Sequence, residues 1–101
     1  MPRRSAARPL GLAITQLIRD LGFEKKLKEQ DMILRWPDIV GGHIAEHARA
    51  VACEGGTLFV EVQSAAWRHE LVYMKSHLIE RLNQEAGSLL IQDIILTNRR
   101  K

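Results

Sequence analysis

The stretch EGGTLFVEVQSAAWRHELVYMKSHLIERLNQEAG, residues 54–87, predicts the end of a hairpin followed by a long helix. Gly55-Gly56 is a two-residue hairpin signal, because both central positions of the favoured turn require positive φ. The preceding residues 49–54 alternate in character, with Val51 and Cys53 expected on one face of a strand. Residues 58–63 alternate again, since Leu58, Val60 and Val62 interleave with Phe59, Glu61 and Gln63, so they predict a half-buried second strand.

The helix that follows has a predicted start and a predicted end. The hydroxyl of Ser64 can accept a bond from a backbone N–H in the first turn. Gly87 is expected to close the helix just after Ala86, in the left-handed conformation. Between them, one face carries apolar side chains three or four residues apart: Trp67, Leu71, Met74, Leu78 and Leu82.

Before the hairpin, the sequence predicts two helices and a short helical turn. Pro9 opens the first helix and Gly22 ends it, and the second runs from Phe23 to Trp36, where Pro37 stops it. Its candidate core positions are Leu27, Ile33, Leu34 and Trp36. A turn of helix follows over residues 41–48, and residues 90–97 predict a last strand. The order α-α-β-β-α-β predicts an α+β domain whose three-stranded sheet is covered on one face by helices.

Length and composition are those of one ordinary globular domain. The chain has 101 residues, 46% apolar and 27% charged, with a formal net charge of +3. No apolar stretch approaches the roughly 20 residues of a membrane span, and the N-terminus lacks the features of a secretory signal. The single cysteine, Cys53, favours a reducing, cytoplasmic compartment and is expected to be a buried, inert thiol.

The positive charge is concentrated at the two ends of the chain. Residues 9–98, the expected domain, hold nine basic and twelve acidic residues, so the body is mildly acidic. We expect residues 1–8 and 99–101 to be basic tails that contact nucleic-acid phosphates without reading sequence. The candidate contacts are Arg3, Arg4, Arg8, Arg99, Arg100 and Lys101, helped by Lys25, Lys26 and Lys28 on an exposed helix face.

The segment HIAEH, residues 43–47, matches the H-x-x-E-H pattern of some zinc peptidases. A catalytic zinc site needs a third protein ligand and a cleft, and the remaining candidates Cys53, His69 and His77 lie in no recognisable motif. We therefore expect His47 to be partly buried and hydrogen-bonded to backbone, and His43 to be solvated. Trp36 and Trp67 are expected in the core, and no Ser/His/Asp arrangement or phosphate-binding glycine pattern is present.

A different resemblance covers nearly the whole chain. The segments WPDIVGGHIAEHARAV (36–51), EGGTLFVEVQSAAWRHELVYMKSHLIERLNQEAG (54–87) and IQDIIL (91–96) resemble the DciA family of small bacterial proteins, long treated as a domain of unknown function. The chain departs from the family at Ala50, where a proline is expected to be common. We call seven of the shared positions the signature residues: Trp36, Gly41, His47, Gly56, Trp67, Leu71 and Asn83.

The resemblance implies a KH-like fold and a role as an operator or loader of the replicative helicase DnaB. It implies binding to DnaB and to DNA, no cofactor, no metal and no catalytic residue, and a cytoplasmic, nucleoid-associated bacterial protein. The G-x-x-G loop with which KH domains clamp a nucleic-acid backbone is missing here. Two rivals stay open, a KH-like RNA-binding module and, more remotely, a zinc hydrolase built on HIAEH. The helicase-docking surface and the oligomeric state are left undecided by the sequence.

Overall fold

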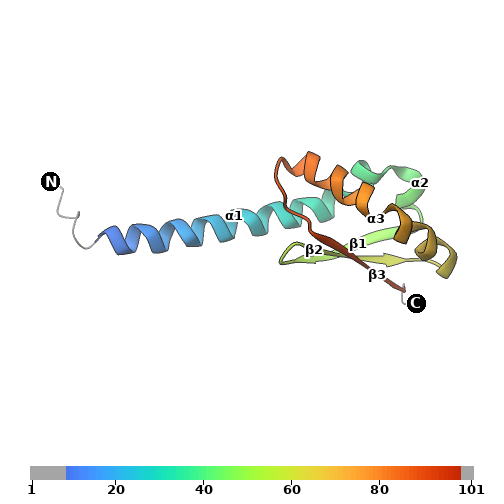
Figure 1. The fold of residues 1–101 in the computed structure, drawn as a ribbon, viewed down its shortest axis with the longest axis horizontal. Coiled ribbons are helices and arrows are strands. Elements are labelled where there is room, and N and C mark those ends of the chain that lie inside the picture. Colours follow the sequence, from blue (N-terminus) through green and yellow to red (C-terminus); the bar gives the residue numbers. More distant parts are fainter. Residues whose placement is uncertain (1–8, 99–101) are drawn as a thin grey trace.

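The structure, a computed structural model, describes residues 9–98 as an α+β domain in the predicted order α-α-β-β-α-β. The helices lie over one face of the sheet, and the N-terminal part of the first helix extends away from the body as an arm (Figure 1). This arm gives the molecule principal extents of 64 × 26 × 18 Å. The elements are α1 (Pro9–Val40), α2 (Gly42–Ala45), β1 (Ala48–Glu54), β2 (Thr57–Val62), α3 (Ala65–Ala86) and β3 (Asp93–Asn98).

The sheet has three strands in the order β1-β2-β3, and it is mixed. β1 and β2 are the antiparallel arms of the predicted hairpin, with Cys53 opposite Leu58. β3 pairs with β2 in parallel, so that Leu58 lies opposite Ile94 and Phe59 opposite Ile95. A parallel neighbour needs a crossover connection, and α3 provides it.

A bulge in β1 corrects the predicted face of Val51. The register with β2 shifts between Ala50 and Ala52, so the extra residue changes which side chains point inward. Ala48 and Ala50 are buried before the bulge and Cys53 is buried after it, while Val51 is exposed. The prediction that Val51 and Cys53 share one face was therefore wrong.

The first two predicted helices are one continuous helix, and both predicted boundaries inside it were wrong. Gly22 lies in the exposed part of α1, where a glycine costs about 1 kcal/mol relative to alanine but does not require a break. Pro37 lies inside the helix. The missing proline N–H removes only one hydrogen bond, and one more turn follows, in which Gly41 donates to the carbonyl of Pro37 at 3.0 Å.

The core lies between the sheet and the two long helices. Trp36 and Met32 of α1, 1% exposed each, belong to one buried cluster with Leu58 and Val60 of β2 and the buried leucines of α3. Two predicted core positions of α1 were wrong, because Leu27 and Leu34 are 54% and 78% exposed. Met32 and Trp36, four residues apart, share the face that Leu27 and Leu34 do not.

Both predicted ends of α3 are confirmed. The Ser64 hydroxyl accepts a bond from the backbone N–H of Trp67 at 3.2 Å, and Gly87 adopts φ 73° at the C-terminal end. The last strand begins later than predicted, at Asp93. Leu90 and Ile91 are buried, but they belong to the connection before β3. No helix within residues 9–98 is both long enough and apolar enough to cross a membrane.

Candidate nucleic-acid interface

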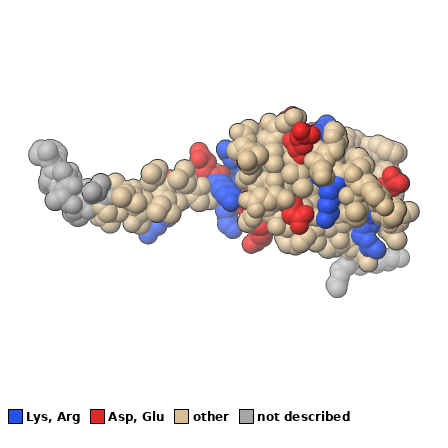
Figure 2. Space-filling model, in the orientation of Figure 1, with Lys and Arg blue, Asp and Glu red and all other residues tan. Residues whose placement is uncertain are grey.

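Of the predicted nucleic-acid contacts, three lysines of α1 lie within the residues that the structure describes. Lys25, Lys26 and Lys28 are exposed and lie just before Glu29, the first buried residue of α1 from position 11 onward. Basic side chains gather where the arm joins the body, with acidic side chains nearby (Figure 2). The six basic residues predicted in the tails, Arg3, Arg4, Arg8, Arg99, Arg100 and Lys101, lie outside the described residues.

Of the nine Lys and Arg residues within 9–98, three pair with carboxylates (Arg35, Arg49 and Lys75), and the three lysines are among the six that do not. Arg49 pairs with Glu61 at 3.0 Å and Lys75 lies 3.8 Å from Asp93. Within residues 9–98, no acidic oxygen lies within 4.0 Å of the ammonium groups of Lys25, Lys26 or Lys28. These three ammonium groups are therefore free to meet an external anion such as a phosphate.

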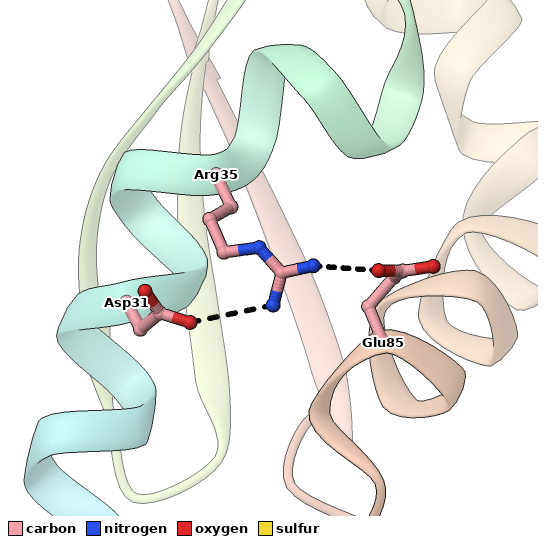
Figure 3. Close-up of polar contacts among 3 residues, drawn as sticks. All are labelled: Asp31, Arg35 and Glu85. Atoms are coloured by element: carbon pink, nitrogen blue, oxygen red, sulfur yellow. Dashed lines mark hydrogen bonds and ion pairs between the residues drawn. The ribbon is translucent and has the colours of Figure 1, made fainter.

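Arg35 is engaged within the fold. Its guanidinium bridges Asp31 of the same helix, at 3.4 Å, and Glu85 of α3, at 2.6 Å (Figure 3). All three side chains remain partly exposed, so each ion pair contributes about 0–1 kcal/mol. The bridge holds α1 against the end of α3. The positive charge of Arg35 is therefore already paired within the fold.

The HIAEH segment forms a polar and aromatic cluster with α3. The rings of His43 and His47 are 6.2 Å apart and perpendicular, and His47 stacks on Trp67 with centroids 4.4 Å apart. His47 Nδ1 lies 2.6 Å from the side-chain oxygen of Gln63, which corrects the expected bond to backbone. His43 is exposed, as predicted.

This cluster lacks the ligand set of a zinc centre. The residues that the structure describes contain no group of three His, Cys, Asp or Glu side chains able to hold one metal ion. Trp67 itself is half-buried and packs against the edge of the core, with one ring face covered by His47. The arrangement is that of a packed surface cluster in which the histidines support the tryptophan.

The signature residue Trp36 anchors α1 to the start of β1. Its side chain is 1% exposed, and its indole Nε1–H donates to the carbonyl of Ala48 at 3.0 Å. Gly41 follows just after the end of α1 with φ 93°, a conformation that favours glycine, and it is the residue immediately before α2. Together they set the direction in which the chain leaves α1 for the sheet.

Asn83 and Gly56 fix the connection into β3. The amide of Asn83 donates to the carbonyl of Ile91 at 2.9 Å and accepts from its N–H at 2.7 Å. The carbonyl of Gly56 accepts a bond from Gln92 at 2.7 Å, and a Cβ at Gly56 would lie 3.2 Å from the carbonyl of Leu90. Leu71, a further signature residue, is fully buried.

Glu29 is a structural residue that the sequence reasoning missed. It is 3% exposed, and its carboxylate accepts a hydrogen bond from the backbone N–H of Gly56 at 3.1 Å. A signal for it existed, because Glu29 lies three and seven residues before Met32 and Trp36, on the same helix face. Charge by itself favours solvent at this position, because buried carboxylates are rare.

Cys53 is buried, and its chemistry follows from that position. Burial raises the pKa of the thiol to about 11, and the nearby charges of Glu29 and Glu54 add to the effect. At neutral pH the thiol is protonated, and a protonated thiol is neither a nucleophile nor a metal ligand.

Two comparisons with known proteins identify relatives of this chain. A family model described as "Dna[CI] antecedent, DciA" matches residues 9–96. A UPF0232 protein of Mycobacterium tuberculosis is 32% identical over 89 residues, which cover 88% of this chain and 48% of that protein. A UPF0232 protein of Mycobacterium leprae is 29% identical over 89 residues, with 88% and 47% covered. The chain thus spans about half the length of the curated relatives that it matches.

Proposed function

Because this chain belongs to the DciA family, we propose that it acts in bacterial DNA replication as a non-enzymatic adaptor of the replicative helicase DnaB. The observation that carries the proposal is the family match itself, which covers residues 9–96 and so reaches every element of the fold, including most of β3. In this role the protein binds the helicase and DNA in the cytoplasm, near the nucleoid, and uses no cofactor.

We assign helicase binding and DNA binding to different surfaces from the positions of the side chains. Most signature residues stabilise the fold. Trp36, Gly56 and Leu71 are buried, and Asn83 is hydrogen-bonded to the backbone of Ile91 before β3. The helicase is therefore recognised by the outer surface of the body that these residues hold in shape. DNA is contacted through cations, namely the exposed Lys25, Lys26 and Lys28 together with the six basic residues of the tails.

Contacts of this kind act on phosphates. Lysine is a point charge on a flexible stem, and it binds the backbone of a nucleic acid without distinguishing its bases. The proposed DNA binding is therefore independent of sequence and weakens steeply with salt, because each neutralised phosphate releases counterions.

Co-purification with DnaB tests the proposal. The unaltered chain should retain DnaB, and a variant with all six tail cations changed to glutamine should still retain it while binding DNA much more weakly. The tail variant leaves residues 9–98 unchanged, so loss of DnaB would place the helicase contact in the tails. Failure of the unaltered chain to bind DnaB would sink the proposal.

RNA binding is the rival that the same material can decide. Affinities for structured RNA, single-stranded DNA and duplex DNA are compared at one salt concentration. A preference for single-stranded or duplex DNA supports the adaptor, and a strong preference for RNA supports a KH-like RNA-binding module. A zinc hydrolase would contain bound metal after purification, and its hydrolytic activity would be lost in the His47→Ala variant.

A further inference from the structure

The strand β3, Asp93–Asn98, forms one edge of the sheet. Within residues 9–98, β2 is the only strand that hydrogen-bonds to it, and no backbone hydrogen bond joins it to a helix. The helices lie over one face of the sheet instead (Figure 1). In the part of the chain that the structure describes, the side of β3 that faces away from β2 is therefore an open edge.

The pairing with β2 shows which backbone groups of β3 point outward. The N–H of Asp93 donates to the carbonyl of Gly56, where the parallel pairing begins. Backbone groups alternate in direction along a strand, so Ile94, Leu96 and Asn98 point their N–H and C=O away from β2. The side chain of Asp93 accepts the N–H of Ile94 at 2.8 Å. The open row therefore begins at the carbonyl of Ile94 and continues to Asn98.

This edge lacks the protection that the opposite edge of the sheet has. β1 is interrupted by a bulge between Ala50 and Ala52, and α1 packs against it, with the indole of Trp36 bonded to the carbonyl of Ala48. β3 keeps a regular register along its whole length and contains neither proline nor lysine. Bulges, charges and covering elements normally prevent an edge from pairing with another chain. A regular, open edge is suited to the addition of a strand.

An apolar row crosses the open face of the sheet and ends at β3. Phe59 of β2 lies opposite Ala52 of β1 and opposite Ile95 of β3. Leu58 and Ile94, the residues before Phe59 and Ile95, are fully buried, so this row points away from the helices. Ile95 is 39% exposed. A strand added to β3 would place a side chain beside Ile95, and cross-strand pairs of apolar side chains stabilise a sheet.

The charge along β3 is polarised. Asp93 is the first residue of the strand, and the three residues that follow the strand, 99–101, are all basic. Asp93 is already engaged, because its carboxylate lies 3.8 Å from the ammonium group of Lys75. An added strand therefore gains from acidic side chains next to residues 99–101 and loses from acidic side chains next to Asp93.

We propose that the outer edge of β3 binds an extended segment of a partner protein, antiparallel to β3, with alternating apolar residues and an acidic N-terminal end. Antiparallel pairing is slightly more stable per residue than parallel pairing. It brings the N-terminal end of the segment next to residues 99–101. The main chain supplies the hydrogen bonds, and the acids fix the direction. The inference does not rest on the proposed function, although DNA would compete for the same three cations.

A second copy of the chain fits this edge less well. Two β3 strands paired with one another would bring together the basic residues 99–101 of both copies. The only acid that each strand offers is Asp93, which Lys75 already engages. A segment that carries its own acids compensates these charges. Because the added strand is short, the contact belongs to the small, transient class, and we expect a dissociation constant on the order of 10–100 µM.

Titration with a synthetic peptide tests the inference. The probe has three glutamates followed by three threonine-valine pairs, is blocked at both ends, and is added without nucleic acid to the isotopically labelled full chain. It should shift the amide signals of residues 93–98. A control peptide with the glutamates at its C-terminal end should bind at least about fivefold more weakly. No binding of the probe at about 1 mM, equal binding of the control, or shifts confined to β1 or α1 would overturn the inference.

Backbone methylation separates strand pairing from simple charge attraction. In an antiparallel strand, every second residue of the peptide points its N–H at β3. Two further peptides are N-methylated on all three threonines or on all three valines, and their charge is the same. One should bind like the probe, and the other should bind at least about tenfold more weakly, because it loses its donors to the edge. Equal affinities of the two methylated peptides contradict strand addition.

Asn98 provides a matched pair of changes in the chain itself. Asn98→Pro removes an N–H that points outward at an exposed position, where an edge strand tolerates proline. It should weaken binding of the probe at least about threefold, whereas Asn98→Ala keeps the N–H and should stay within about twofold. Equal affinities of these two variants count against the edge. Sedimentation without peptide completes the test, because a dimer that Asn98→Pro abolishes would assign the edge to a second copy and overturn the inference.

Discussion

Glu29 of α1 accepts a hydrogen bond from the backbone N–H of Gly56, 27 residues later, at 3.1 Å. The contact joins the point where α1 enters the body to the turn between β1 and β2. The side chain of Glu29 and the backbone of Gly56 are both buried, so neither group can turn to water instead. A buried polar group without its partner costs about 1–3 kcal/mol, so this bond fixes the hairpin against the helix.

Removing the side chain of Glu29 should destabilise the domain. We expect Glu29→Ala to lower the free energy of unfolding by about 2–4 kcal/mol, because it leaves the N–H of Gly56 unsatisfied and opens a cavity. Glu29→Gln keeps an acceptor oxygen and should cost less. Gln30→Ala, at the exposed neighbouring position, is the control and should change stability by less than about 0.5 kcal/mol. Urea unfolding measures all three, and equal effects at positions 29 and 30 would contradict the role given to Glu29.

Alanine at two glycines of the chain should have opposite effects. Gly56 has φ 88° and a Cβ there would press on the carbonyl of Leu90, so we expect Gly56→Ala to destabilise by about 1–3 kcal/mol. Gly22 is in an open helical position with nothing within 4 Å of a Cβ. We expect Gly22→Ala to stabilise α1 by up to about 1 kcal/mol. Thermal melting of both variants checks the signs, and a stabilising Gly56→Ala would refute the geometry of the turn.

The two hydrogen bonds between Asn83 and Ile91 should be visible in exchange as well as in stability. Asn83→Ala leaves both backbone groups of Ile91 without these partners, and we expect a loss of about 2–4 kcal/mol. The amide hydrogen of Ile91 should exchange faster in the variant by more than global destabilisation explains. Gln84→Ala, at the adjacent exposed position, is the matched control. If the amide hydrogen of Ile91 exchanges as slowly in Asn83→Ala as in the unaltered chain, its hydrogen bond to Asn83 does not stabilise this connection.

Cys53 should be unreactive in the folded protein. Because burial raises the pKa of the thiol to about 11, its thiolate fraction at pH 8 is roughly two-hundredfold smaller than that of a free cysteine near pKa 8.5. Alkylation by iodoacetamide should be slower than in denaturant by at least that factor. The reverse finding, equal rates with and without denaturant, would place the thiol at the surface.

The same thiol gives stability a dependence on pH at the alkaline end. The folded-state pKa is raised above the unfolded value, so the contribution is complete below about pH 8.5 and is lost as pH rises towards 11. Stability of the unaltered chain should fall more steeply over this window than that of Cys53→Ala. Denaturant titrations at several pH values compare the two slopes, and parallel slopes would exclude a contribution from Cys53.

The lysines at the base of the arm should contribute to DNA binding through charge. We expect the combined change of Lys25, Lys26 and Lys28 to glutamine to weaken duplex binding and to reduce the log–log salt slope by about 2–3, at about 0.9 per phosphate. Lys75→Gln is the control, because this lysine lies beside Asp93. An unchanged salt slope in the triple variant would remove these lysines from the interface.

Local sequence was sufficient where local chemistry decides the structure. The glycine pair between two alternating segments specified the hairpin, and Ser64 and Gly87 specified both ends of α3, because capping and positive φ depend on one or two residues. The apolar spacing of α3 also predicted its buried side, as Leu71, Leu78 and Leu82 show. The order of the hairpin and the helix after it followed from these signals.

Tertiary packing decided what the local signals could not. Pro37 is a helix breaker by propensity, yet α1 runs through it, because Met32, Trp36 and Ile39 bury this end of the helix against the sheet. The bulge at Val51 and the burial of Glu29 arise from contacts between segments distant in sequence, and no local pattern reports a partner 27 residues away. The sequence by itself determined the class of the domain, its hairpin, its caps and its family resemblance. Only the three-dimensional structure decided which charged group enters the core and which apolar helix is left uncovered, because burial is a property of the whole packed chain.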